Sequence, residues 1–325
     1  MVTAIARLRP VATTCLRVRR RFFLPTRALL RCVNLGLPPA AILRIGYGID
    51  AAKLPRADFV VSAGGETLAA NAAAARLLSV PNLFSGRLRG LAPERVDVVL
   101  VSLDRLATHA NHLVCLPPSP IDLRREGRAA ARRLGQDNPP RSVGVLIGGN
   151  SGSFRYHSED WRRLTRFLRD AHRTAAIRWL ATTSRRSQAT IADTLADLAR
   201  DASFGIETFI DYRAPGSLTL RDIYLAADAI LCTDDSTSMI SEAVGACLPV
   251  VAVRPAAGRL AAQEREYRDL LTGRGWYRAL PLAGLSPHAF LAALEEITPP
   301  ARSPLDELAE AIAKRLPRLL AAPGA

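Results

Sequence analysis

The chain has 325 residues, 49% of them hydrophobic and 6% aromatic, a size that usually holds two domains. Its formal net charge is +14, but residues 1–49 hold nine Arg and no acid, and the remaining 35 basic and 30 acidic residues give only +5. Since 42 of the 44 basic residues are Arg, we interpret this excess as genomic base-composition bias and expect no nucleic-acid partner.

No run reaches the roughly 18 to 20 apolar residues of a membrane-spanning helix, which argues against a transmembrane protein. The five cysteines form no CxxC pair and suggest no oxidising compartment. We expect a cytoplasmic protein, at most peripheral at the inner membrane surface.

The Arg-rich N-terminus allows three interpretations. Acid-free, Arg-rich sequence is typical of a mitochondrial transit peptide. A secretory signal peptide is disfavoured, because its apolar core and cleavage site are missing. We favour the interpretation that residues 16–30 form an ordinary part of the first domain. The run RRRFF at 19–23 offers the third interpretation, which is docking on an anionic membrane surface.

From residue 59 onward, apolar strands alternate with helices. In the first half we expect strands within 59–63, 80–84, 96–103 and 112–116 and helices within 68–78 and 126–136. A polar linker with a Pro pair follows at 137–142, so we place the domain boundary at 140 and expect domains 1–140 and 141–325.

The second half repeats this alternation. We expect strands within 142–147, 177–183, 204–210, 229–233 and 249–253, and helices within 158–172, 187–201, 218–227 and 305–320. Continuous apolar strands between helices are typical of parallel sheets covered on both faces. The predicted fold is therefore α/β, with two Rossmann-like, doubly wound domains facing a cleft and a C-terminal helix in the second domain.

The most informative segment is 229–253, AILCTDDSTSMISEAVGACLPVVAV, which predicts strand, hydroxyl-rich loop, helix, Pro turn and strand. Ser236, Thr237 and Ser238 lie at the helix start, where free N–H groups and the helix dipole stabilise an anion. Glu242 follows one or two turns later, in position to accept hydrogen bonds from a ribose. Since ligands bind at the carboxyl edge of parallel sheets, the segment predicts a nucleoside-diphosphate site.

Two further loops are expected at the same edge. Glycines after a strand allow close approach of backbone to phosphate, and a pair of arginines offers bidentate donors for a diphosphate. The candidate phosphate-binding residues of these loops are Gly148, Gly149, Asn150, Ser151, Arg185 and Arg186. A weaker candidate site follows the first strand of the N-terminal domain at Gly64, Gly65 and Glu66.

Other chemistries find less support. Walker A and dinucleotide-binding spacings are absent from the sequence, which disfavours an ATPase or NAD enzyme. Asp234 and Asp235 are more typical of a turn and helix cap than of a metal site. His109 and His112 are interpreted as a solvated loop pair, and His157 is the histidine nearest the candidate loops. We therefore expect no metal and no cofactor, and the sequence identifies no catalytic residue.

Four segments resemble one protein family: PNLFSGRLRG at 81–90, VLIGGNSGSFRYHSEDWRRL at 145–164, ATTSRR at 181–186 and residues 227–253. They are similar to the ELM1 family of plant mitochondrial-fission proteins and bacterial homologues, which in turn resembles the GT-B glycosyltransferases. The resemblance implies a nucleotide-sugar held mainly by the C-terminal domain. It would place phosphate at Ser236–Ser238, ribose at Glu242 and the Gly148–Asn150 loop opposite the diphosphate.

The resemblance leaves two functions open. One is a metal-independent transferase that passes a glycosyl group from a nucleotide-sugar to a cell-envelope acceptor. The other is a non-catalytic scaffold that acts at a membrane surface, as the plant members suggest. Family members begin with a strand and a Gly-containing loop that this chain does not show, so the acceptor-side domain is expected to lack its first βα unit. No catalytic base is identifiable there.

Overall fold

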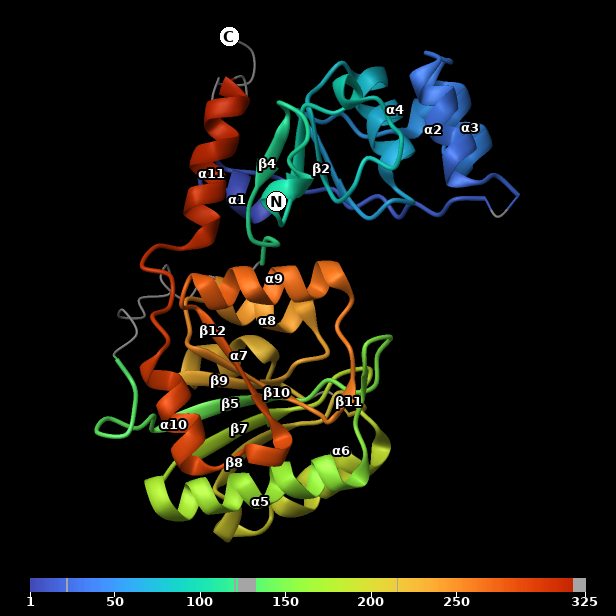
Figure 1. The fold of residues 1–325 in the computed structure, drawn as a ribbon. Coiled ribbons are helices and arrows are strands. Elements are labelled where there is room, and N and C mark those ends of the chain that lie inside the picture. The colour runs from blue at the N-terminus through green and yellow to red at the C-terminus, as the bar shows by residue number, and fades with distance from the viewer. Residues whose placement is uncertain (22, 120, 122–132, 215, 318–325) are drawn as a thin grey trace. The chain divides into compact units, whose positions relative to one another are not determined.

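The computed structural model describes residues 1–21, 23–119, 121, 133–214 and 216–317 (Figure 1). The chain divides into two compact units, Met1–Pro118 with the segment from Pro304 onward, and Ser119–Ser303. The division thus falls before the Pro-rich linker expected at 137–142. Leu134 is buried in the second unit's core, and the Gln136 N–H donates to the Glu295 carboxylate at 2.7 Å. Most of the helix expected at 126–136 lies outside the described residues.

The first unit is built on a four-stranded parallel sheet in the order β1-β2-β3-β4. Its strands are β1 Val60–Ala63, β2 Asn82–Ser85, β3 Val98–Val101 and β4 His112–Val114. Its helices are α1 Val2–Ile5, α2 Thr26–Asn34, α3 Pro39–Tyr47, α4 Leu68–Leu78 and α11 Pro304–Arg315. The described part of residues 1–59 contains no strand, so the chain enters this sheet at β1.

Both faces of this sheet are covered, because successive apolar residues of a strand point to opposite faces. Phe84 and Val99 share a core with α2, α3 and α4, and Leu83 and Val98 share one with α1 and α11. Leu308 of α11 is buried in that second core. The C-terminal helix, expected in the second domain, therefore belongs to the first unit.

The second unit contains a six-stranded parallel sheet in the order β12-β10-β9-β5-β7-β8. Its strands are β5 Ser142–Leu146, β7 Arg178–Thr182, β8 Ile206–Ile210, β9 Ala229–Thr233, β10 Val250–Arg254 and β12 Tyr277–Pro281. The chain runs from β5 outward to β7 and β8, then returns to β9 on the other side, which is the doubly wound Rossmann order. A short antiparallel pair, β6 Phe154–Arg155 with β11 Ala257–Gly258, lies outside the main sheet.

Helices cover both faces of the second sheet (Figure 1). They are α5 Ser158–Ala175, α6 Ala189–Leu198, α7 Leu220–Ala226, α8 Thr237–Gly245, α9 Ala262–Gly273 and α10 Pro287–Glu295. The core beneath α5, α6 and α10 joins Phe167, Trp179 and Phe290, and α8 and α9 lie on the opposite side. The expected class, α/β with two parallel sheets, is confirmed, whereas a cleft between the domains stays a prediction.

Among the helices of the described residues, none combines the length and the apolar character that a transmembrane segment needs.

Candidate functional site

The carboxyl edge of the second sheet has a crevice-forming topology between β5 and β9. The two strands are hydrogen-bonded neighbours, but the chain leaves β5 toward β7 and leaves β9 toward β10. Loops that diverge from adjacent strands leave space for a ligand at such a switch point. The loops after β5, β7 and β9, each predicted to carry phosphate ligands, meet at this edge.

Gly148 and Gly149 are closely packed by the protein itself. The Gly148 N–H donates to the Thr233 hydroxyl at 2.7 Å. A Cβ on Gly148 would lie 2.2 Å from Asp235 Oδ1, and one on Gly149 would lie 2.0 Å from the Arg186 carbonyl oxygen. Contacts this short are not sterically allowed. Glycine is required at 149, where the obstacle is backbone, whereas a side chain at 148 would force the Asp235 carboxylate to move. That requirement exists without any phosphate.

Asp235 and Arg186 form an ion pair next to these glycines. Oδ2 of Asp235 lies 2.8 Å from Nη2 of Arg186, and the Asp235 side chain is 0% exposed against 39% for Arg186. Burial raises the pKa of Asp235, while the Thr233 hydroxyl, Arg186 and the Gly149 N–H offset part of that rise. One of the two arginines predicted to clamp a diphosphate therefore neutralises a carboxylate of the protein. The other, Arg185, is exposed and forms no ion pair among the described residues.

Asp234 points to a separate buried network. Its Oδ2 accepts from Arg254 Nε at 2.8 Å, and its Oδ1 accepts from Arg268 Nε at 3.0 Å and from the Tyr277 hydroxyl at 2.7 Å. Arg268, on α9, is also buried. The two aspartates lie in a turn, as expected, but neither caps a helix, because the N-cap of α8 is Ser236.

The N-terminus of α8 carries the three predicted hydroxyl residues. The Ser236 hydroxyl accepts from the Met239 N–H at 3.4 Å and lies 3.1 Å from the Ser238 hydroxyl. The Thr237 hydroxyl accepts from Arg268 Nη1 at 2.7 Å, while Ser238 is exposed. The backbone N–H groups of Thr237 and Ser238 belong to the first turn and have no acceptor within the helix. Two amides and one exposed hydroxyl thus remain available to an anion.

Glu242 lies further along α8, partly buried. Among the described residues no group donates a hydrogen bond to its carboxylate, and burial raises its pKa. Its charge acts on Tyr224 of α7, whose pKa is raised mainly by burial and secondarily by Glu242. A partly buried carboxylate usually has a donor. Glu242 therefore has unused acceptor capacity at the position predicted for a ribose.

Asn150 and Ser151 shape the loop that follows the glycines. The Asn150 side-chain oxygen accepts from the Tyr156 N–H at 2.8 Å. The Ser151 hydroxyl accepts from the N–H groups of Ser153 and Phe154, both at 3.2 Å. These side chains are engaged in loop hydrogen bonds that lead the chain into β6.

Comparison with known protein families identifies the family of this chain. A model described as mitochondrial fission ELM1 matches residues 4–319. The chain belongs to the ELM1 family. This confirms the resemblance drawn from the sequence segments. A search of curated proteins gave no match to the ELM1-family chain.

Several solved structures are loosely similar to this ELM1-family chain. MurG of Acinetobacter baumannii is 17% identical over 89% of this chain and 77% of its own, with a TM-score of 0.43. MnaA of S. aureus, solved with UDP, is 12% identical over 92% and 83%, with a TM-score of 0.48. The UDP-GlcNAc 2-epimerase of Methanocaldococcus jannaschii, in complex with UDP-GlcNAc and UDP, is 12% identical over 90% and 80%, with a TM-score of 0.45.

The weaker candidate residues Gly64, Gly65 and Glu66 lie in the first unit of the ELM1-family chain. Gly64 directly follows β1 and has a φ of +83°, and the Glu66 carbonyl accepts from the Tyr47 hydroxyl at 2.9 Å. The Glu66 carboxylate lies 3.7 Å from Arg20 Nη2. These contacts order the turn between β1 and α4.

The sequence did not predict the residues that bind the Asp234 carboxylate at this edge of the sheet. Arg254, Arg268 and Tyr277 hold Asp234, yet the sequence predicted neither α9 nor β12. Arg268 follows directly on the buried Tyr267 in a helix rich in charged residues, so its burial left no recognisable pattern. The backbone N–H of His157 donates to the Asp160 carboxylate at 2.9 Å, where α5 begins. His157 therefore has a local role at a helix start.

Proposed function

We propose that the second unit of this ELM1-family chain binds a nucleotide-sugar at the carboxyl edge of its sheet. The observation that carries the proposal is Glu242, a partly buried acid with no hydrogen-bond donor among the described residues. It follows Ser236, the N-cap of α8, by six residues. Six residues of α-helix rise about 9 Å, a separation that a nucleoside diphosphate spans between its ribose hydroxyls and its outer phosphate.

The diphosphate in this proposal lies at the start of α8. The amides of Thr237 and Ser238, the Ser238 hydroxyl and the helix dipole favour negative charge there. Arg185 is the exposed cation of the neighbouring loop. Arg186 supports the site indirectly, because its ion pair with Asp235 keeps that carboxylate from repelling the ligand.

We further propose that the bound nucleotide-sugar passes its glycosyl group to a cell-envelope acceptor. Helix N–H groups and arginines stabilise the charge that develops on a departing diphosphate, without a metal ion. None of the three acids at this edge is assigned as the general base. Asp234 and Asp235 are bound to arginines, and Glu242 is assigned to the ribose.

One observation favours a second candidate, a non-catalytic scaffold of the mitochondrial-fission type acting at a membrane surface. The Gly148–Gly149 loop is packed against Asp235 and the Arg186 backbone rather than left open. A protein that has lost turnover tolerates such internal packing. The two candidates differ in whether a nucleotide-sugar binds.

The test is a thermal-shift and calorimetric screen of the full chain with UDP-, GDP-, ADP- and CMP-sugars. A ligand at 100 times its Kd stabilises the folded state by about 2.7 kcal/mol. Glu242→Ala should weaken binding at least tenfold, about 1.4 kcal/mol. Asp269→Ala, which removes an exposed acid of α9, is the control and should bind like the wild type. No response to any of the four classes would support the scaffold instead.

A further inference from the structure

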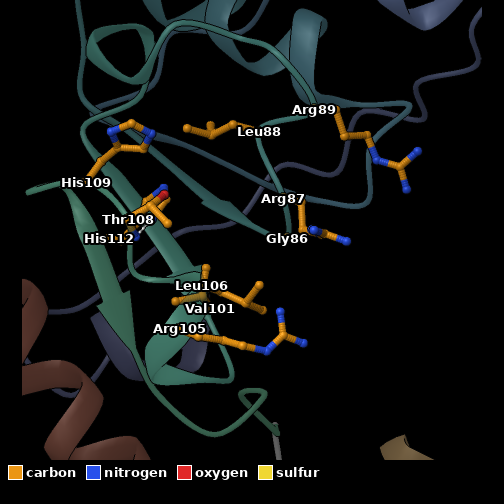
Figure 2. Close-up of a pocket in the computed structure, with 10 residues that line it drawn as sticks. All are labelled: Gly86, Arg87, Leu88, Arg89, Val101, Arg105, Leu106, Thr108, His109 and His112. Atoms are coloured by element: carbon orange, nitrogen blue, oxygen red, sulfur yellow. Dashed lines mark hydrogen bonds between the residues drawn. The ribbon is translucent and has the colours of Figure 1, made fainter. Parts of the chain in front are cut away.

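The first unit contains a pocket that none of the residues assigned above lines. It has a volume of about 650 Å³ and lies between the loop after β2, residues 86–89, and the connection from β3 to β4. Figure 2 shows the side chains that line it. Its volume is within the range of small-molecule sites and far exceeds that of a single inorganic ion.

The charge of this pocket has one sign. Arg87, Arg89 and Arg105 line it together with His109 and His112, and none of the lining residues is acidic. The three arginines are exposed and extend toward the same side of the view in Figure 2. Several basic side chains gathered on one pocket create a positive potential that concentrates anions.

The buried wall of the pocket holds a polar group with an unused hydrogen bond. His112, expected in a solvated loop, is only 9% exposed and begins β4. Its Nδ1 accepts from the Thr108 N–H at 3.0 Å, so the neutral ring carries its proton on Nε2. Among the described residues, no group meets hydrogen-bond geometry with buried Nε2. Burial lowers the pKa of His112, and a contact of the ring with the Leu106 backbone offsets part of that fall. A buried donor without an acceptor costs stability, and a ligand oxygen would remove that cost.

The remaining wall is apolar. Leu88 and Val101 are buried, and Leu106 is partly buried beside them. The ring of His109 stands edge-on to His112, with centroids 5.1 Å apart. The pocket thus combines a cationic rim, an apolar wall and, at His112, one buried nitrogen without a hydrogen-bond partner, which fits a molecule with an anionic group on an organic body.

We propose that this pocket binds the phosphate monoester of a small organic molecule. The guanidinium groups of Arg87 and Arg89 hold the phosphate, since their paired N–H groups match phosphate oxygens. His112 Nε2–H donates to an oxygen of the ligand, and Leu88, Val101 and Leu106 contact its carbon framework. The pocket is built by the first unit alone, whereas the proposed nucleotide-sugar edge belongs to the second.

Calorimetry of the full chain with glucose 1-phosphate tests this proposal, with glucose and inorganic phosphate as comparison ligands. We expect glucose 1-phosphate to bind and glucose not to bind. His112→Asn retains an acceptor for the Thr108 N–H but lacks the Nε2 donor, and it should weaken binding about tenfold or more. The double variant Arg87→Ala/Arg89→Ala should do the same. Arg44→Ala removes an exposed charge elsewhere in the unit and should change affinity less than twofold.

Histidine NMR signals locate the bound ligand. Glucose 1-phosphate should shift the His112 signal and leave that of His157 in the second unit unchanged. Equal losses in His112→Asn and Arg44→Ala, or a shift confined to His157, would overturn the proposal. UDP-sugar binding that is lost in Glu242→Ala but retained in His112→Asn would show that the two ligands use different sites. The proposal for one site can therefore fail while the other holds.

Discussion

Arg186→Ala leaves the Asp235 carboxylate buried without its ion-pair partner. Removing one partner of a fully buried pair typically costs about 3–5 kcal/mol. Arg186 is 39% exposed, so solvent screens the pair and we expect a smaller loss, about 1–3 kcal/mol at pH 7. Arg185→Ala, which removes the exposed neighbour, should change stability by less than about 0.5 kcal/mol.

The loss in Arg186→Ala should depend on pH. The pKa of Asp235 is already raised by burial, and removing Arg186 raises it further. An acid whose pKa is higher in the folded state than in the unfolded state destabilises the fold when ionised. The deficit of the variant should therefore shrink as pH falls from 7 to 5 and carboxylate protonation increases. Asp235→Asn in the same chain should restore most of the stability at pH 7.

Urea unfolding followed by Trp fluorescence measures this effect in the relevant unit. Trp161, Trp179 and Trp276 all lie in Ser119–Ser303, so their emission reports the second unit alone. Equal stability of Arg186→Ala and Arg185→Ala would refute the reasoning. So would a deficit that Asp235→Asn does not relieve, because the cost would then have another cause.

Three further predictions concern the same edge. Gly149→Ala should destabilise the second unit by about 1–3 kcal/mol or more, since its Cβ meets backbone at 2.0 Å, whereas Gly152→Ala, with nothing within 4 Å, should not; urea unfolding compares them. Asp234→Asn should cost about 3–5 kcal/mol by leaving buried Arg268 without a counter-charge, and thermal unfolding at wild-type Tm would contradict this. Glu242→Gln removes an acid whose pKa burial raises, so the variant should match or exceed wild-type stability at pH 8. That advantage should fall toward zero at pH 4, as urea titrations at both pH values will show.

Much of the strand pattern followed from the sequence because buried parallel strands are continuous apolar runs. Residues 142–147 and 229–233 were expected as strands and correspond to β5 and β9. Their loops were expected at one sheet edge, because the carboxyl ends of parallel strands share an edge. Strand β12 and helix α9 were missed, since YRALP and AQEREYRDLLTG mix charged and apolar residues without a clear period.

The partners of the charged residues could not be predicted. Arg186 and Asp235 are 49 positions apart, and their pairing depends on how two loops meet above the sheet. The glycines at 148 and 149 were interpreted as phosphate-approach residues, but the atoms that exclude a Cβ belong to Asp235 and Arg186. His112 looked like a loop residue because the register that buries it at the start of β4 is set by pairing with Val99.

Hydrogen–deuterium exchange of the full chain with and without a saturating UDP-, GDP-, ADP- or CMP-sugar tests the central claim most directly. If the nucleotide-sugar binds at the start of α8, the amides of Thr237 and Ser238 gain an acceptor, and their exchange should slow in the wild type and, at ligand concentrations near the wild-type Kd, slow much less in Glu242→Ala. Binding that leaves these amides unprotected would contradict the account, as would failure of all four ligand classes to bind.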